Sequence, residues 1–218
     1  MRESYKREGV YKEIQIPISA NIALEGELKI PMNSNRIIIF SHGSGSSRKS
    51  LRNQMVATRL HQQKIGTLLF DLLTEEEDRN YSNRFNINLL TDRLILVTEW
   101  LTSQKEFVGF KIGYFGASTG SASALRASAV LSKVVGAVVS RGGRPDLATS
   151  ILPKITMPVL LIVGSRDDDV VALNEKAFAL LTGEKKLKII EGATHLFEEE
   201  GALEKVAEEA INWFQKYL

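Results

Sequence analysis

The spacing of hydrophobic and polar positions changes along the chain. Residues 10–31 alternate, with an apolar residue at nearly every second position on either side of a polar break at residues 19–21. A period of two is typical of strands with one buried face, so this segment is predicted to form an antiparallel hairpin. Short, almost continuous apolar runs follow and are predicted to be buried strands. They lie at residues 36–40, 66–70, 110–115, 134–139, 157–163 and 187–190.

Longer segments separate most of these runs, and several have apolar residues at helical spacing. An alternation of strands and helices predicts an α/β fold, in which a mostly parallel sheet carries helices on both faces. Residues 71–86 are polar and acidic and are predicted to form an irregular loop. Helices are predicted at residues 50–63, 87–101, 171–181 and 198–218, and another begins near residue 121.

One serine lies between a predicted strand and a predicted helix, in Gly116-Ala117-Ser118-Thr119-Gly120. Gly-x-Ser-x-Gly in this position is the sequence pattern of a nucleophile elbow. The turn is so sharp that side chains two residues before and after the serine would collide, and glycine removes them. The start of the helix then directs free N–H groups and its positive dipole end at any oxyanion formed beside Ser118.

Three other loops follow predicted strands, and such loops gather at the carboxyl edge of an open parallel sheet. Residues 41–47 are mostly glycine and serine, residues 164–170 include three consecutive aspartates, and residues 191–197 include His195. Serine, acid and histidine in this order along the chain is the order of an α/β-hydrolase triad.

These segments make the chain resemble the α/β-hydrolase superfamily over essentially its whole length. Within it, the sequence looks most like the small proteins without a cap domain that are grouped with the dienelactone hydrolases. Dienelactone hydrolase proper has a cysteine nucleophile, and this chain has no cysteine. The resemblance therefore implies the fold and the triad but not the substrate. The matching segments are His42-Gly43-Ser44-Gly45, Gly116-Ala117-Ser118-Thr119-Gly120, Gly164-Ser165-Arg166-Asp167-Asp168-Asp169-Val170 and Gly192-Ala193-Thr194-His195.

The resemblance implies a role for each triad residue. Ser118 would attack an acyl carbonyl after His195 removes its proton, and His195 would later protonate the leaving group. The acid that orients the histidine follows a strand in the superfamily as Gly-x-x-Asp, with an apolar residue three positions on. Asp167 fits that register, and Asp168 is the reserve candidate. Asp169 is predicted to be the N-cap of the next helix.

An oxyanion hole needs two backbone N–H donors. Thr119, the residue after the nucleophile, is expected to supply one. The superfamily's His-Gly-x register assigns the other to Ser44. His42, in the same loop, is expected to support the loop geometry rather than to transfer protons. His61 lies at a polar helix end and is expected at the surface.

Two arginines follow the strand after the elbow helix. Arg141 and Arg144 could each bind a carboxylate or phosphate of the substrate. Pairing with the acidic residues 75–78, or solvation, is equally compatible with the sequence, which leaves these alternatives open. Arg141 is the candidate for substrate binding.

Composition limits the other classes of function. Hydrophobic residues make up 44% and charged residues 25%, and the net charge of +2 gives no reason to expect nucleic acid or a membrane as a partner. The absence of cysteine excludes disulfides and thiolate metal sites. Residues 1–8 lack the apolar stretch of a signal peptide, and no run is long enough for a membrane span. A cytoplasmic protein is expected, with residues 1–218 forming one domain and no separate cap domain.

The sequence thus predicts a serine hydrolase that acts on an ester, thioester or related acyl bond of a small molecule, with no metal or organic cofactor. A peptidase or an acyltransferase with the same triad is an alternative. A non-catalytic binding protein on the same fold is another, although binding alone does not require all three triad residues. The oligomeric state is not predicted.

Overall fold

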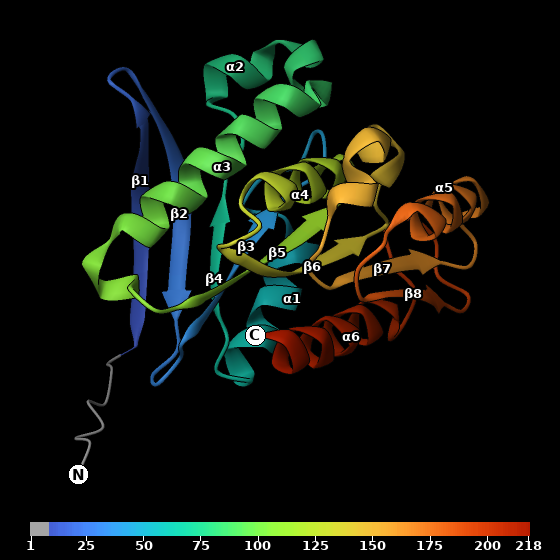
Figure 1. Ribbon diagram of the computed structural model, residues 1–218. Coiled ribbons are helices and arrows are strands. Elements are labelled where there is room, and N and C mark those ends of the chain that lie inside the picture. The colour runs from blue at the N-terminus through green and yellow to red at the C-terminus, as the bar shows by residue number, and fades with distance from the viewer. Residues whose placement is uncertain (1–8) are drawn as a thin grey trace.

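The computed structural model describes residues 9–218, which form an eight-stranded sheet with helices on both faces (Figure 1). The segment Met1–Glu8, where no signal peptide is predicted, lies outside the described residues. The strand order is β1-β2-β4-β3-β5-β6-β7-β8. The strands are β1 (Val10–Ser19), β2 (Ile22–Ile30), β3 (Arg36–Ser41), β4 (Gly66–Phe70), β5 (Lys111–Ala117), β6 (Val135–Arg141), β7 (Val159–Gly164) and β8 (Lys185–Ile190).

Strand pairing confirms the predicted fold class. β1 and β2 form the antiparallel hairpin, in which Ile16 lies opposite Leu24, and β2 also pairs antiparallel with β4. The remaining strand pairs are parallel. Parallel strands need crossover connections, and here helices supply most of them.

Two hydrophobic cores hold the helices against the sheet. Successive residues of a strand point to opposite faces, and β3 shows this because Ile37 and Ile39 enter one core while Ile38 and Phe40 enter the other. The first core packs under α3 (Ile87–Ser103), α4 (Thr119–Val130), the 3₁₀ helix η3 (Pro145–Lys154) and α5 (Asp168–Leu180). The second packs under α1 (Leu51–Gln62) and α6 (Ala202–Tyr217). Figure 1 shows α3, α4 and α5 on one side of the sheet and α6 on the other.

The prediction of an irregular loop at residues 71–86 is wrong. Two short helices, α2 (Glu75–Arg79) and the 3₁₀ helix η1 (Tyr81–Phe85), occupy most of it. A capping box starts α2: the Thr74 hydroxyl accepts from the Glu77 N–H, and the Glu77 carboxylate accepts from the Thr74 N–H. Thr-x-x-Glu is the sequence signature of this motif, so the signal was present. A further 3₁₀ turn, η2 (Lys105–Phe107), follows α3.

The strand order reverses direction at β3. From β3 the chain first adds β4 on one side and later adds β5 on the other. A crevice forms at the carboxyl ends of the strands where such a reversal occurs, because the two connections leave in opposite directions. The loop after β3 and the turn after β5 meet at this point, so the fold itself places Gly43 next to Ser118.

Among the helices of residues 9–218, none has both the length and the apolar composition that a bilayer span requires. The expectation of a single domain without a cap stays a prediction.

Candidate active site

Ser118 lies at a strained turn between β5 and α4. Its φ is 50° and its ψ is −123°, a conformation that costs a non-glycine residue free energy and persists only when its surroundings impose it. Two backbone hydrogen bonds do so here. The Ser118 N–H donates to the Arg141 carbonyl (3.1 Å), and the Ser118 carbonyl accepts from the Arg144 N–H (3.1 Å).

The two glycines of the motif stand where a side chain would not fit. A Cβ on Gly116 would lie 2.6 Å from Ser121 Cα, and one on Gly120 would overlap the carbonyl oxygens of Ser41 and His42. The start of α4 is therefore pressed against the end of β3. Small side chains extend the contact between β3 and α4, because Ser41 Oγ and Ser123 Oγ are hydrogen-bonded at 2.8 Å.

His195 and Asp167 meet at the same edge of the sheet. His195 Nδ1 lies 2.6 Å from Asp167 Oδ2, and the two side chains are 38% and 16% exposed. A carboxylate can only accept, so this bond places the hydrogen on Nδ1 and leaves the Nε2 lone pair free to act as a base.

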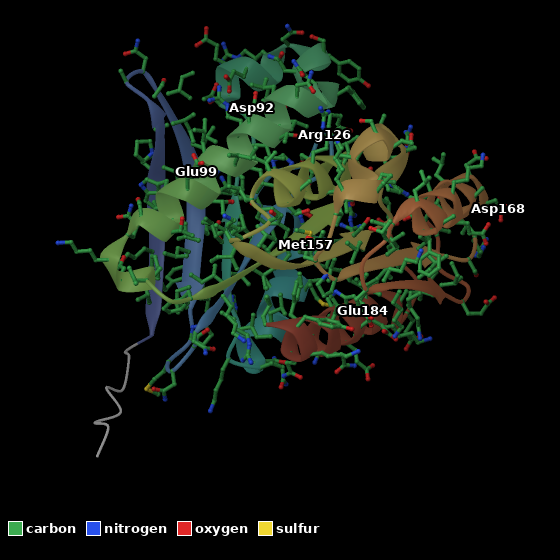
Figure 2. All side chains as sticks on the ribbon, viewed as in Figure 1. Asp92, Glu99, Arg126, Met157, Asp168 and Glu184 are labelled. Carbon is green, nitrogen blue, oxygen red and sulfur yellow. The ribbon has the colours of Figure 1, made fainter. Side chains whose placement is uncertain are left out.

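Only the first of the three aspartates contacts the histidine. α5 begins at Asp168, and Asp167 occupies its N-cap position without making a capping hydrogen bond, because its carboxylate bonds His195 instead. The prediction that Asp169 is the N-cap is therefore wrong by two residues. Asp168 and Asp169 are exposed in the first turn of α5, and Figure 2 shows Asp168 at the outer edge of the molecule.

Hydrogen bonds from backbone N–H groups join the two loops that carry this pair. The Arg166 N–H donates to the Ala193 carbonyl (2.9 Å), and the Gly192 N–H donates to Ser165 Oγ (2.8 Å). Gly164 permits the contact, since a Cβ there would overlap Ala193. The acid and the histidine thus belong to one connected unit.

The turn after β6 links this unit to Ser118. Arg141 accepts the Ser118 N–H, and a Cβ on the next residue, Gly142, would lie 3.5 Å from His195 Nδ1. No hydrogen bond joins the side chains of Ser118 and His195 among the described residues. Such bonds are often long in a free enzyme and shorten when substrate binds.

The loop after β3 approaches Ser118 from the other side. A Cβ on Gly43 would lie 3.0 Å from Ser118 Cβ. The Ser44 N–H, predicted as an oxyanion donor, donates to Thr119 Oγ1 at 2.8 Å. Thr119 is the first residue of α4, so its own N–H has no partner within the helix.

His42 holds this loop in place. Its Nδ1 donates to the Gly43 carbonyl (2.9 Å), and its Nε2 accepts from the Leu72 N–H (3.1 Å), so the ring is neutral and both nitrogens are occupied. Burial lowers the pKa of His42, which agrees with the neutral form. The expectation that His42 supports loop geometry fits these bonds.

The structure shows the partners of three side chains that the sequence placed at the surface or left with open alternatives. His61 is not a free surface residue: it is half-buried, Nε2 bonds Thr67 Oγ1 (2.7 Å), and burial, with a contribution from Lys29, lowers its pKa to about 4. Arg144 pairs with Asp146 at 2.8 Å rather than with residues 75–78. Arg141 is only 6% exposed and donates to Asn53 Oδ1 (3.2 Å).

The environment of Arg141 contains no carboxylate partner within residues 9–218. Its guanidinium lies 5.8 Å from the centre of the Phe197 ring, two residues beyond His195, and its Nε has no hydrogen-bond partner. Burial and the nearby charge of Arg52 lower the pKa of Arg141 to about 10. The sequence did not indicate how deeply this side chain is buried.

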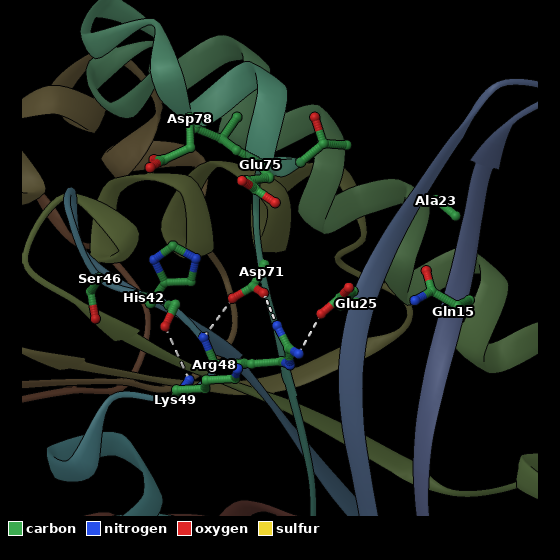
Figure 3. Close-up of a pocket in the computed structure, with 13 residues that line it drawn as sticks. Gln15, Ala23, Glu25, His42, Ser46, Arg48, Lys49, Asp71, Glu75 and Asp78 are labelled. Atoms are coloured by element: carbon green, nitrogen blue, oxygen red, sulfur yellow. Dashed lines mark hydrogen bonds and ion pairs between the residues drawn. The ribbon is translucent and has the colours of Figure 1, made fainter.

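A polar pocket of about 470 Å³ lies beside the loop after β3 (Figure 3). His42 lines this pocket, and the next residue of the loop, Gly43, packs against Ser118. Arg48 also lines it and is paired with both Glu25 and Asp71. The remaining lining residues are Gln15, Ala23, Ser46, Ser47, Lys49, Leu73, Thr74, Glu75 and Asp78.

Sequence reasoning missed this pocket and the Thr119 hydroxyl. Asp71 directly follows β4 at the carboxyl edge of the sheet, which was an available signal. The pairing of Arg48 with Glu25 joins segments that only the folded sheet brings together, so no local pattern announced it. Within residues 9–218, His, Asp and Glu side chains form no group of three or more placed to hold a metal ion.

The sheet order, the turn at Ser118 and the histidine–aspartate pair define an α/β hydrolase. The family model described as "Dienelactone hydrolase family" matches residues 56–218. The chain belongs to the dienelactone hydrolase family.

Solved structures agree with this assignment. A crystal structure of dienelactone hydrolase from Anabaena variabilis ATCC 29413 is 48% identical and has a TM-score of 0.93, covering 97% of this chain and 100% of that one. Est1E from Butyrivibrio proteoclasticus, at 17% identity, has a TM-score of 0.78 over 96% of this chain and 98% of its own. The second likeness shows the fold alone.

Two Mycobacterium tuberculosis proteins, from strains CDC 1551 / Oshkosh and ATCC 25618 / H37Rv, are each 50% identical over 207 residues. Both are named "Putative phosphoribosyl transferase". The match covers 95% of this chain and 46% of each relative, so the chain spans less than half the length of these proteins.

The close approach of α4 to β3 can be tested by Gly120→Ala. The added methyl would overlap the carbonyl oxygens of Ser41 and His42, so we expect the free energy of unfolding to fall by about 3 kcal/mol or more. The control is Gly109→Ala, where φ is 82° and a Cβ would meet nothing within 4 Å. Strain alone should cost that variant about 1–2 kcal/mol. Urea denaturation measures both, and equal losses would contradict the close approach.

Proposed function

We propose that this chain is a serine hydrolase that cleaves an ester, thioester or related acyl bond. Ser118 is the nucleophile, His195 the general base and acid, and Asp167 the acid that orients His195. One observation carries the proposal: the 2.6 Å bond from His195 Nδ1 to Asp167 Oδ2 lies at the same sheet edge as the strained turn of Ser118. Membership of a hydrolase family supports it independently.

The acylation step follows from these positions. His195 Nε2 takes the hydroxyl proton as Ser118 Oγ bonds the acyl carbon, and the carbonyl π electrons move to its oxygen. That oxyanion forms at the N-terminus of α4, where the Thr119 N–H and the positive end of the helix dipole stabilise it. When the carbonyl re-forms, the bond to the leaving group breaks, and His195 gives that group its proton.

Deacylation repeats the sequence with water. His195 removes a proton from water, the hydroxide bonds the acyl carbon, and collapse of the second oxyanion releases the acid and returns the proton to Ser118 Oγ. Asp167 stays ionised and stabilises the imidazolium in both halves of the reaction. The chemistry requires no metal or organic cofactor.

Three alternatives to this proposal are a peptidase, an acyltransferase and a non-catalytic binding protein. A peptidase or an acyltransferase would use the same three residues, and only the acceptor or the leaving group would differ. A non-catalytic binding protein would not need the strained serine together with an oriented histidine. The name of the mycobacterial relatives describes proteins in which more than half of the length has no counterpart in this chain, so it does not decide the activity of this region.

Arg141 is proposed to favour substrates that carry an anionic group. Its buried guanidinium donates to the neutral side chain of Asn53 and has no carboxylate partner within residues 9–218. A buried cation without a counter-ion gains free energy from a nearby anion, because a low dielectric strengthens the attraction.

The acid assignment is tested by changing each aspartate to asparagine. Asp167→Asn should lower kcat by as much as about 10⁴, because asparagine can stabilise the wrong histidine tautomer. Asp168→Asn and Asp169→Asn serve as matched controls, since both side chains are exposed in the first turn of α5. Each should cost at most about 1 kcal/mol of stability and little activity. If Asp168→Asn were the crippling change, the assignment of Asp167 would be wrong.

The pocket beside His42 is proposed to receive the acyl group of the substrate, and its lining predicts a preference for short or polar acyl groups. Each buried methylene contributes about 0.8 kcal/mol, so an enzyme for long chains gains from an extended apolar tunnel. Ala23 and Leu73 supply apolar side chains to this pocket, against four carboxylates and two cations. Values of kcat/KM for p-nitrophenyl acetate through palmitate should therefore be highest at the short end of the series. A maximum at long chains would contradict the assignment of this pocket to the substrate.

A further inference from the structure

The hydroxyl of Thr119 is bonded to one of the two groups expected to form the oxyanion hole, the Ser44 N–H, and belongs to the residue that carries the other. Thr119 follows the nucleophile, is 4% exposed and begins α4. Its Oγ1 accepts the Ser44 N–H at 2.8 Å, and its own backbone N–H has no partner in the helix. One residue therefore combines a free N–H group with a hydroxyl that the loop after β3 holds in place.

The hydroxyl hydrogen of Thr119 is not used in the bond between Ser44 and Thr119. An N–H can only donate, so Thr119 Oγ1 is the acceptor and its own hydrogen must point elsewhere. No protein acceptor for that hydrogen is found within residues 9–218. A buried hydroxyl that donates to nothing is unfavourable, and accepting one hydrogen bond makes a hydroxyl a stronger donor. Thr119 thus offers a polarised donor beside the nucleophile.

The resting structure also shows why Ser44 is not free to act alone. Its N–H is already directed at Thr119 Oγ1, so direct donation to an oxyanion would require breaking that bond. Donation through the threonine requires no such change. The Ser44 N–H continues to donate to Oγ1, and the Thr119 O–H donates onward.

We propose that the Thr119 side chain is a catalytic donor of the oxyanion hole, with the Ser44 N–H as the positioning group that orients it. Thr119 then supplies both donors, its backbone N–H and its Oγ1–H. When Ser118 Oγ bonds the acyl carbon, the carbonyl electrons move to the oxygen and the serine proton moves to His195 Nε2. The Thr119 proton stays on Oγ1 throughout and is only shared in a hydrogen bond. The proposal rests on Ser118 being the nucleophile.

The test compares Thr119→Val, which keeps the shape and removes the hydroxyl, with Thr119→Ser, which keeps the hydroxyl. Losing an oxyanion-hole donor lowers kcat by about 10²–10³, so Thr119→Val should lose about 10²–10³-fold in kcat with little change in KM. Thr119→Ser should stay within about tenfold of the wild type, because serine retains the donor. Thr119→Ala repeats the test in case the valine variant does not fold. Thr58→Val, at an exposed threonine of α1, is the control for the substitution itself.

A second readout separates catalysis from support of the loop. Phenylboronic acid forms a tetrahedral adduct with an active serine, so its inhibition constant should rise in Thr119→Val by about the factor by which kcat/KM falls. Thermal midpoints should stay close to the wild type. Near wild-type kcat in both Thr119→Val and Thr119→Ala would overturn the proposal, as would an equal loss in Thr119→Ser.

Failure of the underlying function gives a different result. If Ser118→Ala retained turnover, the nucleophile would be wrong and the role of Thr119 would fall with it. If Ser118→Ala were inactive while Thr119→Val kept its activity, only the role of Thr119 would be wrong.

Discussion

The close contact between the start of α4 and the end of β3 determines the geometry of the whole site. Gly120 lies against the carbonyls of Ser41 and His42, and Gly116 lies against the first turn of the same helix. This crowding, together with the bonds that Ser118 donates to the Arg141 carbonyl and accepts from the Arg144 N–H, holds Ser118 at its positive φ of 50°. The strain is local, and its cost is met by two extensive hydrophobic cores that fix β3, β5 and α4 relative to one another.

The histidine–aspartate pair takes the place of a helix-capping hydrogen bond. Asp167 stands at the N-cap of α5, where a free carboxylate would stabilise the helix by about 1 kcal/mol. Its side chain bonds His195 instead, and Asp168 and Asp169 supply negative charge to the first turn of the helix. The three consecutive aspartates thus divide between orienting a histidine and stabilising a helix.

The sequence was sufficient for the fold because its signals are local. The hairpin, the buried strands and the elbow glycines each depend on short patterns, and the register Gly-x-x-Asp selected Asp167, the aspartate whose carboxylate bonds His195. The helix start in the same loop was misplaced, because the pattern does not say that Asp167 would use its carboxylate elsewhere. Residues 71–86 were misjudged for a different reason: their charges suggested a loop, while the capping box of Thr74 and Glu77 starts a helix.

What the sequence could not predict depends on contacts between distant segments. The burial of Arg141 against Asn53 and Phe197 joins β6, α1 and the loop after β8. The bond from the Ser44 N–H to Thr119 Oγ1 depends on the rotamer of one side chain, which no pattern specifies. Both contacts lie within the candidate site, where a single charge or hydrogen bond affects which reaction the site can perform.

The central claim is that Ser118 is activated for nucleophilic attack, and an irreversible phosphonylating probe tests it most directly. A fluorophosphonate reacts with serines activated by a general base, because the hydroxyl alone is a poor nucleophile. Mass spectrometry of the labelled and digested protein should find the phosphonyl group on the peptide that contains Ser118, with labelling abolished in Ser118→Ala. Absence of labelling in the folded wild-type protein, or labelling at another serine, would contradict the account.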